Sequence, residues 1–130
     1  MTEKSGKILY AEDSETLRAV CLMLFAKLLP DYEIECFEDG TSLEKRLNNG
    51  LENVKLVLTD NDMPGATGSS IIMNYAQRPE FGNLPFILFY GGHENIGKEL
   101  VERHGAFSYI SKGIDHPNSL IAKIRKALDH

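Results

Sequence analysis

The chain of 130 residues is 42% hydrophobic and 25% charged, the composition of one globular domain that can bury a core without disulfides or a structural metal. Its 14 basic residues against 19 acidic residues give a formal net charge of −5, which argues against nucleic acids and anionic membranes as partners. The sequence has no apolar run long enough to cross a membrane and no signal peptide, so we predict a cytoplasmic protein.

Strands and helices are expected to alternate along the whole chain. In chain order, the expected segments are strand 8–11, helix 14–29, strand 33–37, helix 41–49, strand 54–59, helix 69–78, strand 86–90, helix 94–104, strand 107–110 and helix 117–129. Most of the strands are continuous apolar runs, which is typical of parallel strands covered by helices on both faces. The strand at 33–37 instead alternates apolar and charged residues, which favours the edge of the sheet. Apolar residues three and four positions apart predict the helices.

Capping residues and prolines indicate where the helices begin and end. Ser14 is suited to cap the first helix, and Pro30 follows the end of that helix. The spacing of Thr41 and Glu44 is that of a capping box, which predicts the start of the second helix. Pro79 closes the third helix.

The cysteines Cys21 and Cys36 fit reduced thiols better than a disulfide framework or a zinc site, because the sequence contains no CxxC pair. Cys21 lies on the apolar stripe of the first helix, and Cys36 lies at an apolar position of the expected edge strand. We therefore expect both thiols to be buried and unreactive.

Alternating strands and helices predict a single α/β domain over residues 1–130, with its core at about 7–128, built on a doubly wound parallel sheet. Sheets of this kind bind ligands outside the carboxyl ends of their strands. Residues that directly follow the strands are therefore the candidates for function. The polar residues at these places are Glu12, Asp13, Asp60, Asp62 and Lys112.

The candidate residues combine several carboxylates with a lysine. Carboxylates at one rim repel one another and resist ionisation, and a hard divalent cation such as Mg²⁺ relieves that repulsion. A carboxylate nucleophile, a metal ion and a lysine are the groups needed for phosphoryl transfer to an aspartate. Taken singly, each residue also has a simpler explanation, as a helix cap, a turn residue or a solvated lysine.

The order and spacing of these residues resemble the receiver domain of two-component response regulators, over about residues 7–128. The residues that carry the resemblance are the pair Glu12-Asp13, the segment Asp60-x-x-Met63-Pro64-Gly65-x-x-Gly68, the pair Leu84-Pro85 before the fourth strand, and Lys112. The resemblance implies a flavodoxin-like (βα)5 fold with strand order 2-1-3-4-5. It also implies Mg²⁺ as the cofactor and a histidine kinase or phosphotransfer protein as the phosphoryl donor.

The resemblance assigns a role to each residue at the rim. Asp60 would be the phosphoacceptor, and Lys112 would contact first Asp60 and then the phosphoryl group. Asp13 would bind Mg²⁺ directly, Glu12 would act through water, and Asp60 and the backbone carbonyl of Asp62 would supply further ligands.

Two tyrosines and a glycine stand at or near positions that, in receivers, take part in the conformational switch on phosphorylation. Tyr109 matches the family's rotating aromatic position, and the signal would pass to the face made by the last two helices and the last strand. Tyr90 stands where receivers carry Thr or Ser, and its hydroxyl lies further out on a bulky ring. Lys112 is followed by Gly113 rather than Pro, so a trans peptide bond is expected there. Packing at the strand ends alone would also account for both tyrosines.

Three functions compete. The leading interpretation is a phosphorylation-controlled signalling domain that acts through protein contacts and catalyses at most its own phosphorylation and dephosphorylation. The second is a receiver-like interaction domain that no longer uses phosphorylation, which Tyr90 and Gly113 support. The third is a phosphohydrolase, because Asp60-Asn61-Asp62 resembles the D-x-D motif of haloacid-dehalogenase-like enzymes. That motif normally lies near the start of its domain and requires a further acidic pair downstream, which is missing here.

Overall fold

The computed structural model describes residues 4–91, 94–112 and 117–129. Its strands are β1 (Gly6–Ala11), β2 (Tyr32–Phe37), β3 (Val54–Asp60), β4 (Phe86–Tyr90) and β5 (Ser108–Ser111). Its helices are α1 (Glu15–Leu28), α2 (Gly40–Leu47), α3 (Gly68–Tyr75), α4 (Glu94–Arg103) and α5 (Pro117–Leu128), and a 3₁₀ turn covers Pro79–Phe81. The alternation of strands and helices expected from the sequence is confirmed.

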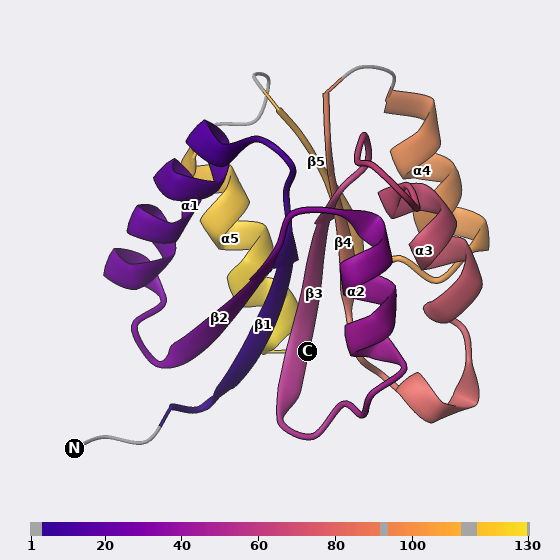
Figure 1. Cartoon of the computed structure of the whole chain (residues 1–130), viewed down its shortest axis with the longest axis horizontal. Coiled ribbons are helices and arrows are strands. Elements are labelled where there is room, and N and C mark those ends of the chain that lie inside the picture. Colours follow the sequence, from indigo (N-terminus) through magenta and orange to yellow (C-terminus); the bar gives the residue numbers. More distant parts are fainter. Residues whose placement is uncertain (1–3, 92–93, 113–116, 130) are drawn as a thin grey trace.

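The five strands form one parallel sheet in the order β2-β1-β3-β4-β5, as expected from the resemblance. Helices α1 and α5 cover one face of the sheet, and α2, α3 and α4 cover the other (Figure 1). This is the doubly wound flavodoxin-like arrangement. The direction of winding reverses between β1 and β3, so the loops that follow these two strands lie side by side.

Each face of the sheet carries its own apolar core, because side chains alternate along a strand. Leu9 and Ala11 of β1 pack with α2, α3 and α4, whereas Ile8 and Tyr10 pack with α1 and α5. All residues of β4 are buried, which explains its continuous apolar sequence.

Two helices begin at residues other than those expected. Helix α2 is capped by Asp39 rather than Thr41, and the Asp39 side chain accepts a hydrogen bond from the N–H of Ser42 at 2.7 Å. Helix α3 is capped by Thr67 and ends at Tyr75, so it starts before the expected residue 69 and stops short of 78. In both helices the first residue is a glycine in a tight contact, which the sequence pattern does not reveal.

The edge strand β2 is confirmed, but one of its side chains departs from expectation. Cys36 is exposed, so the prediction of a buried thiol was wrong for this residue and holds only for Cys21. An edge strand has a neighbour on one side only, which leaves Cys36 open to solvent. Glu35 is partly covered, because Arg46 of α2 binds its carboxylate with Nε–Oε2 at 2.8 Å.

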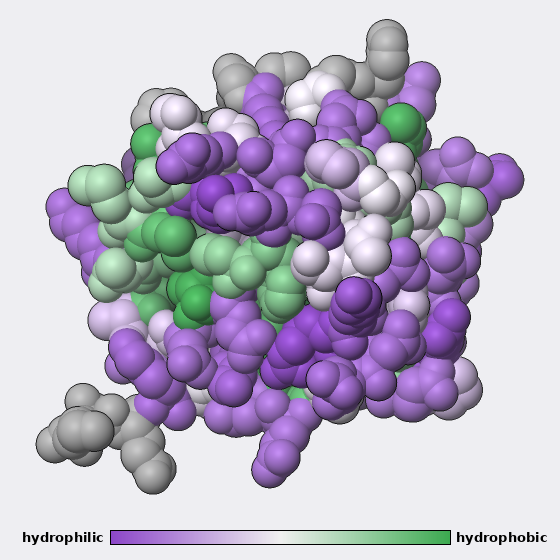
Figure 2. Space-filling view, in the orientation of Figure 1, coloured by the Kyte–Doolittle hydropathy of each residue, from purple (hydrophilic) through white to green (hydrophobic). Residues whose placement is uncertain are grey.

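The face of the molecule drawn in Figure 2 is largely hydrophilic, with an apolar patch over α1 and β2. On α1, Val20 is 56% and Met23 is 75% exposed, so this helix is apolar on its outer side as well as on its core side. Within the described residues, no helix combines the length and the apolar character needed to span a bilayer.

The loop between β3 and α3 is fixed against the start of α2. The N–H of Gly40 donates to the carbonyl of Pro64 at 3.0 Å. A Cβ on Gly40 would lie 1.9 Å from the carbonyl oxygen of Ala66, so only glycine allows this approach. Gly65 turns the loop with a φ of 83°, a conformation that favours glycine. The loop that follows Asp60 therefore has a defined path.

Candidate functional site

The candidate residues lie at the carboxyl edge of the sheet, at the top of Figure 1, where the chain passes from each strand to the next helix. Glu12 and Asp13 follow β1, Asp60 is the last residue of β3, and Lys112 follows β5. Because β1 and β3 are neighbours, their carboxylates are brought together although 47 positions separate Asp13 from Asp60 along the chain.

Lys112 connects two of the carboxylates. Its Nζ lies 2.8 Å from Oδ1 of Asp60 and 3.0 Å from Oε1 of Glu12. Glu12 is 0% and Asp60 2% exposed, so both carboxylates are removed from solvent. The Lys112 ammonium also lies 5.2 Å from the centre of the Phe89 ring, which borders the site. The sequence-based grouping of these three residues agrees with the geometry.

Contacts with neighbouring residues hold the Asp60 carboxylate and its peptide. Oδ1 accepts a hydrogen bond from the N–H of Asn61 at 2.8 Å, and the Asp60 carbonyl accepts one from the hydroxyl of Thr59 at 2.9 Å. A Cβ on Gly68 would lie 2.1 Å from that carbonyl, so Gly68 allows α3 to start directly against the end of β3. The side-chain oxygen of Asn61 accepts a hydrogen bond from the N–H of Ser69 at 3.0 Å, which joins the two ends of the loop between β3 and α3.

Burial and neighbouring charges change the acidity of the site. Burial, with the nearby Glu12 carboxylate, raises the pKa of Asp60 to about 7, although Lys112 acts to lower it. Burial alone would lower the pKa of Lys112, but its contacts with Asp60 and Glu12 outweigh that effect and raise it. Lys112 therefore stays cationic, whereas the carboxylates of the cluster repel one another.

One oxygen from each of Glu12, Asp13 and Asp60 lies within 4.8 Å of the other two, which is close enough for a single ion to contact all three. Asp13 is exposed, whereas the other two carboxylates are buried, so the cluster opens to solvent on one side. Carboxylate oxygens are hard ligands of the kind that Mg²⁺ prefers. The cluster can hold such a cation. Asp62 is exposed in the following loop and is not among the described carboxylates of the cluster.

The two tyrosines lie beside the site. Tyr90 is 3% exposed and belongs to the core between the sheet and helices α2 to α4. Its ring centre lies 6.0 Å from that of Tyr109, at a tilt of 48°. Tyr109 packs against Gly97 of α4, where a Cβ would lie 2.5 Å from Cγ of Tyr109. Gly113, the other departure from the family pattern, lies outside the described residues.

Sequence reasoning missed Arg18, which reaches back from α1 to the acidic turn. Its Nη1 donates to the backbone carbonyl of Glu12 at 2.7 Å. Its position one turn after Ser14 was the available signal, but a hydrogen bond to a main-chain carbonyl leaves no pattern of residue types. Asn61 was missed as a loop anchor for a similar reason.

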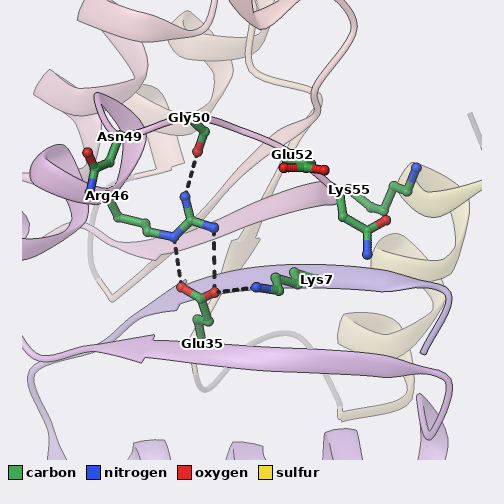
Figure 3. A pocket seen from close by; sticks show the side chains of 8 residues that line it. Lys7, Glu35, Arg46, Asn49, Gly50, Glu52 and Lys55 are labelled. Carbon is green, nitrogen blue, oxygen red and sulfur yellow. Dashed lines mark hydrogen bonds and ion pairs between the residues drawn. The ribbon is translucent and has the colours of Figure 1, made fainter. Parts of the chain in front are cut away.

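A wide hollow of about 800 Å³ lies at the opposite end of the sheet, and none of the candidate residues lines it (Figure 3). Three of its charged groups are joined by ion pairs. Glu35 is bound by Arg46 at 2.8 Å and by Lys7 at 3.2 Å, and Arg46 also donates to the carbonyl of Gly50. These contacts join α2 to β1 and β2, so the network has a structural role.

Solved structures with a similar fold include several response regulators. A putative response regulator from Chloroflexus aurantiacus is 20% identical, with 98% of this chain and 100% of that chain covered and a TM-score of 0.83. The chemotaxis response regulator CheY4 of Vibrio cholerae is 18% identical, with 97% and 99% covered and a TM-score of 0.75. A DNA-binding response regulator of the LuxR family from Staphylococcus aureus is 23% identical, with 95% and 98% covered and a TM-score of 0.78. At these identities the similarity shows the fold alone.

No curated protein sequence matches the chain. The sequence does match the family described as the response regulator receiver domain, over residues 8–125. This range contains the carboxylates at the ends of β1 and β3 and the lysine after β5. The family match over most of the chain and the shared strand order lead to one conclusion: the chain belongs to the response regulator receiver domain family of two-component signalling.

Proposed function

We propose that the domain accepts a phosphoryl group on Asp60 in a Mg²⁺-dependent reaction and thereby changes its contacts with partner proteins. The observation that carries this proposal is the Lys112 ammonium, which contacts Asp60 and Glu12 at once within a cluster of three carboxylates. A nucleophilic carboxylate, a cation site and a fixed lysine are the components of phosphoryl transfer to aspartate.

Each residue has a distinct task in this proposal. An oxygen of Asp60 forms the new bond to phosphorus while the bond between phosphorus and the donor breaks. Lys112, kept cationic by its two carboxylate partners, moves from Asp60 to the transferred group and balances its charge. Glu12, Asp13 and the backbone carbonyl of Asp62 would hold Mg²⁺, which supplies positive charge to the phosphoryl oxygens.

The donor in this proposal is a phosphohistidine of a histidine kinase or phosphotransfer protein. A protein donor must approach the open side of the cluster, next to the first turn of α1. The exposed Val20 and Met23 on that helix offer an apolar contact for it. The chain's net charge of −5 does not favour DNA as a direct partner. Beyond its own phosphorylation and dephosphorylation, we assign the domain no enzymatic activity.

One observation favours a second candidate, an interaction domain that does not use phosphorylation. Tyr90 replaces the small hydroxyl residue of the family, and its ring is built into the core. A ring in that place cannot move toward the phosphoryl group without opening a cavity, which costs several kcal/mol, on the order of 3–5 for a whole aromatic side chain. The phosphohydrolase alternative loses support, because Asp62 is exposed outside the described carboxylate cluster.

The test is the intact mass of the protein after incubation with acetyl phosphate, with Mg²⁺ or with EDTA. The proposal expects a gain of one phosphoryl group with Mg²⁺ only, and no gain in Asp60→Asn. Absence of a gain in the folded, Mg²⁺-bound wild type, followed by the same absence with a phosphohistidine donor, would favour the second candidate.

A further inference from the structure

Arg18 lies in the first turns of α1, yet its side chain turns back to the loop before the helix. Nη1 donates to the Glu12 carbonyl at 2.7 Å, and Nη2 lies 3.4 Å from Oε1 of Glu38. The Arg18 side chain is only 14% exposed, whereas Glu38 is 78% exposed. The hydrogen bond to the Glu12 carbonyl is therefore more shielded from solvent than the ion pair with Glu38. It contributes more to stability, because exposed ion pairs contribute little.

Glu12 is held at both its backbone and its side chain. Its N–H donates to the carbonyl of Phe37 at 3.0 Å, and its Oε2 accepts the N–H of Ser14 at 3.2 Å. Lys112 pairs with its other carboxylate oxygen at 3.0 Å. The bond from Arg18 fixes the remaining group, the carbonyl of the peptide that joins Glu12 to Asp13.

Asp13 depends on that peptide. Its carboxylate is exposed, although it contributes one of the oxygens that lie within 4.8 Å of each other in the cluster. A solvent-exposed side chain is aimed chiefly by its backbone, and the plane of the preceding peptide sets the direction of that backbone. Arg18 fixes this plane, so it fixes where the Asp13 oxygen can lie.

We propose that Arg18 is a positioning residue for Mg²⁺, acting through the Glu12–Asp13 peptide; this inference rests on the metal site of the proposed function. Two effects of Arg18 have opposite signs. Its positive charge beside the carboxylates weakens the binding of a divalent cation, whereas its bond to the peptide strengthens binding by holding Asp13 in place. The proposal states that the positioning effect is the larger one.

The test compares three variants by isothermal titration calorimetry with MgCl₂, after removal of metal with EDTA. Arg18→Met keeps the apolar stem and removes the charge and the donors, while Arg18→Lys keeps the charge and one donor group. Lys27→Met makes the matched change at an exposed position in the last turn of the same helix, and serves as the control. Urea unfolding in EDTA measures the stability of each variant without the metal.

We expect Arg18→Met to weaken Mg²⁺ binding by about tenfold, the lower end of the range for groups that orient metal ligands. Arg18→Lys should recover most of that loss, and Lys27→Met should bind as the wild type does. Tighter or unchanged binding in Arg18→Met would overturn the proposal, even if the variant is less stable in EDTA. Failure of the wild type to bind Mg²⁺ would instead overturn the metal site itself, and the inference with it.

Discussion

The substitution Asp60→Asn should stabilise the metal-free protein, although it removes the proposed phosphoacceptor. Asp60 is 2% exposed and lies within 4.8 Å of two other carboxylates, so its ionised form is unfavourable in the native state. Burial raises its pKa from 3.8 to about 7, which means that the native state holds the proton more tightly than the unfolded chain does. The wild type therefore loses stability as the pH rises through this window, and the neutral amide of the variant does not.

The magnitude follows from the pKa shift. Each unit corresponds to about 1.4 kcal/mol, so roughly three units give an upper limit of about 4 kcal/mol at neutral pH and above. This limit already includes the favourable contact with Lys112, and relaxation of the buried site around the charge reduces the energy further. We expect Asp60→Asn to be more stable than the wild type by about 1–3 kcal/mol at about pH 8, and to differ little at about pH 4.

The assay is urea unfolding followed by far-ultraviolet circular dichroism, in EDTA, at several pH values. The chain has no tryptophan, so the backbone signal is the suitable probe. The reasoning would be refuted by a variant that is less stable than the wild type at about pH 8, or by a stability difference that does not grow with pH.

Three further predictions concern other parts of the molecule. Arg46 lowers the pKa of Glu35, so Glu35→Gln should reduce the free energy of unfolding by about 0.5–1 kcal/mol at neutral pH. This loss should vanish in acid, where Glu35 of the wild type is protonated, and urea unfolding at neutral and acidic pH checks it. Gly97→Ala should destabilise the protein by about 1–3 kcal/mol, because the new Cβ would lie 2.5 Å from Cγ of Tyr109. Thermal unfolding measures this loss, and an unchanged melting temperature would contradict the prediction. Met23→Lys should slow phosphoryl transfer from a kinase by more than about fivefold and leave transfer from acetyl phosphate unchanged; equal effects on both donors would contradict the α1 contact.

The fold could be predicted from the sequence because its pattern is local and repeated. Buried parallel strands need continuous apolar residues, and β4 has nothing else. The rim residues could be grouped because parallel strands end at the same edge, which places Asp60 beside Glu12 once the strand order is known. Neither step depends on detailed packing.

The features that could not be predicted depend on contacts between distant segments. Asp39 and Thr41 are both suitable caps, and the choice is made by the packing of Gly40 on Ala66. Cys36 lies at an apolar position of an alternating strand, but its exposure depends on how far α1 covers the edge strand. The bond from Arg18 to a backbone carbonyl depends on the shape of a turn, which residue types do not report.

The measurement that tests the central claim most directly is the location of the phosphoryl group. Wild-type protein phosphorylated by acetyl phosphate with Mg²⁺ is treated with borohydride, which reduces an acyl phosphate to an alcohol, and the modified peptide is sequenced by mass spectrometry. The account predicts that the reduced residue is Asp60 and that Lys112→Met greatly lowers its yield, because Lys112 contacts Asp60 at 2.8 Å. Modification of Glu12, Asp13 or Asp62 with Asp60 intact, or no modification of a folded protein, would contradict the account.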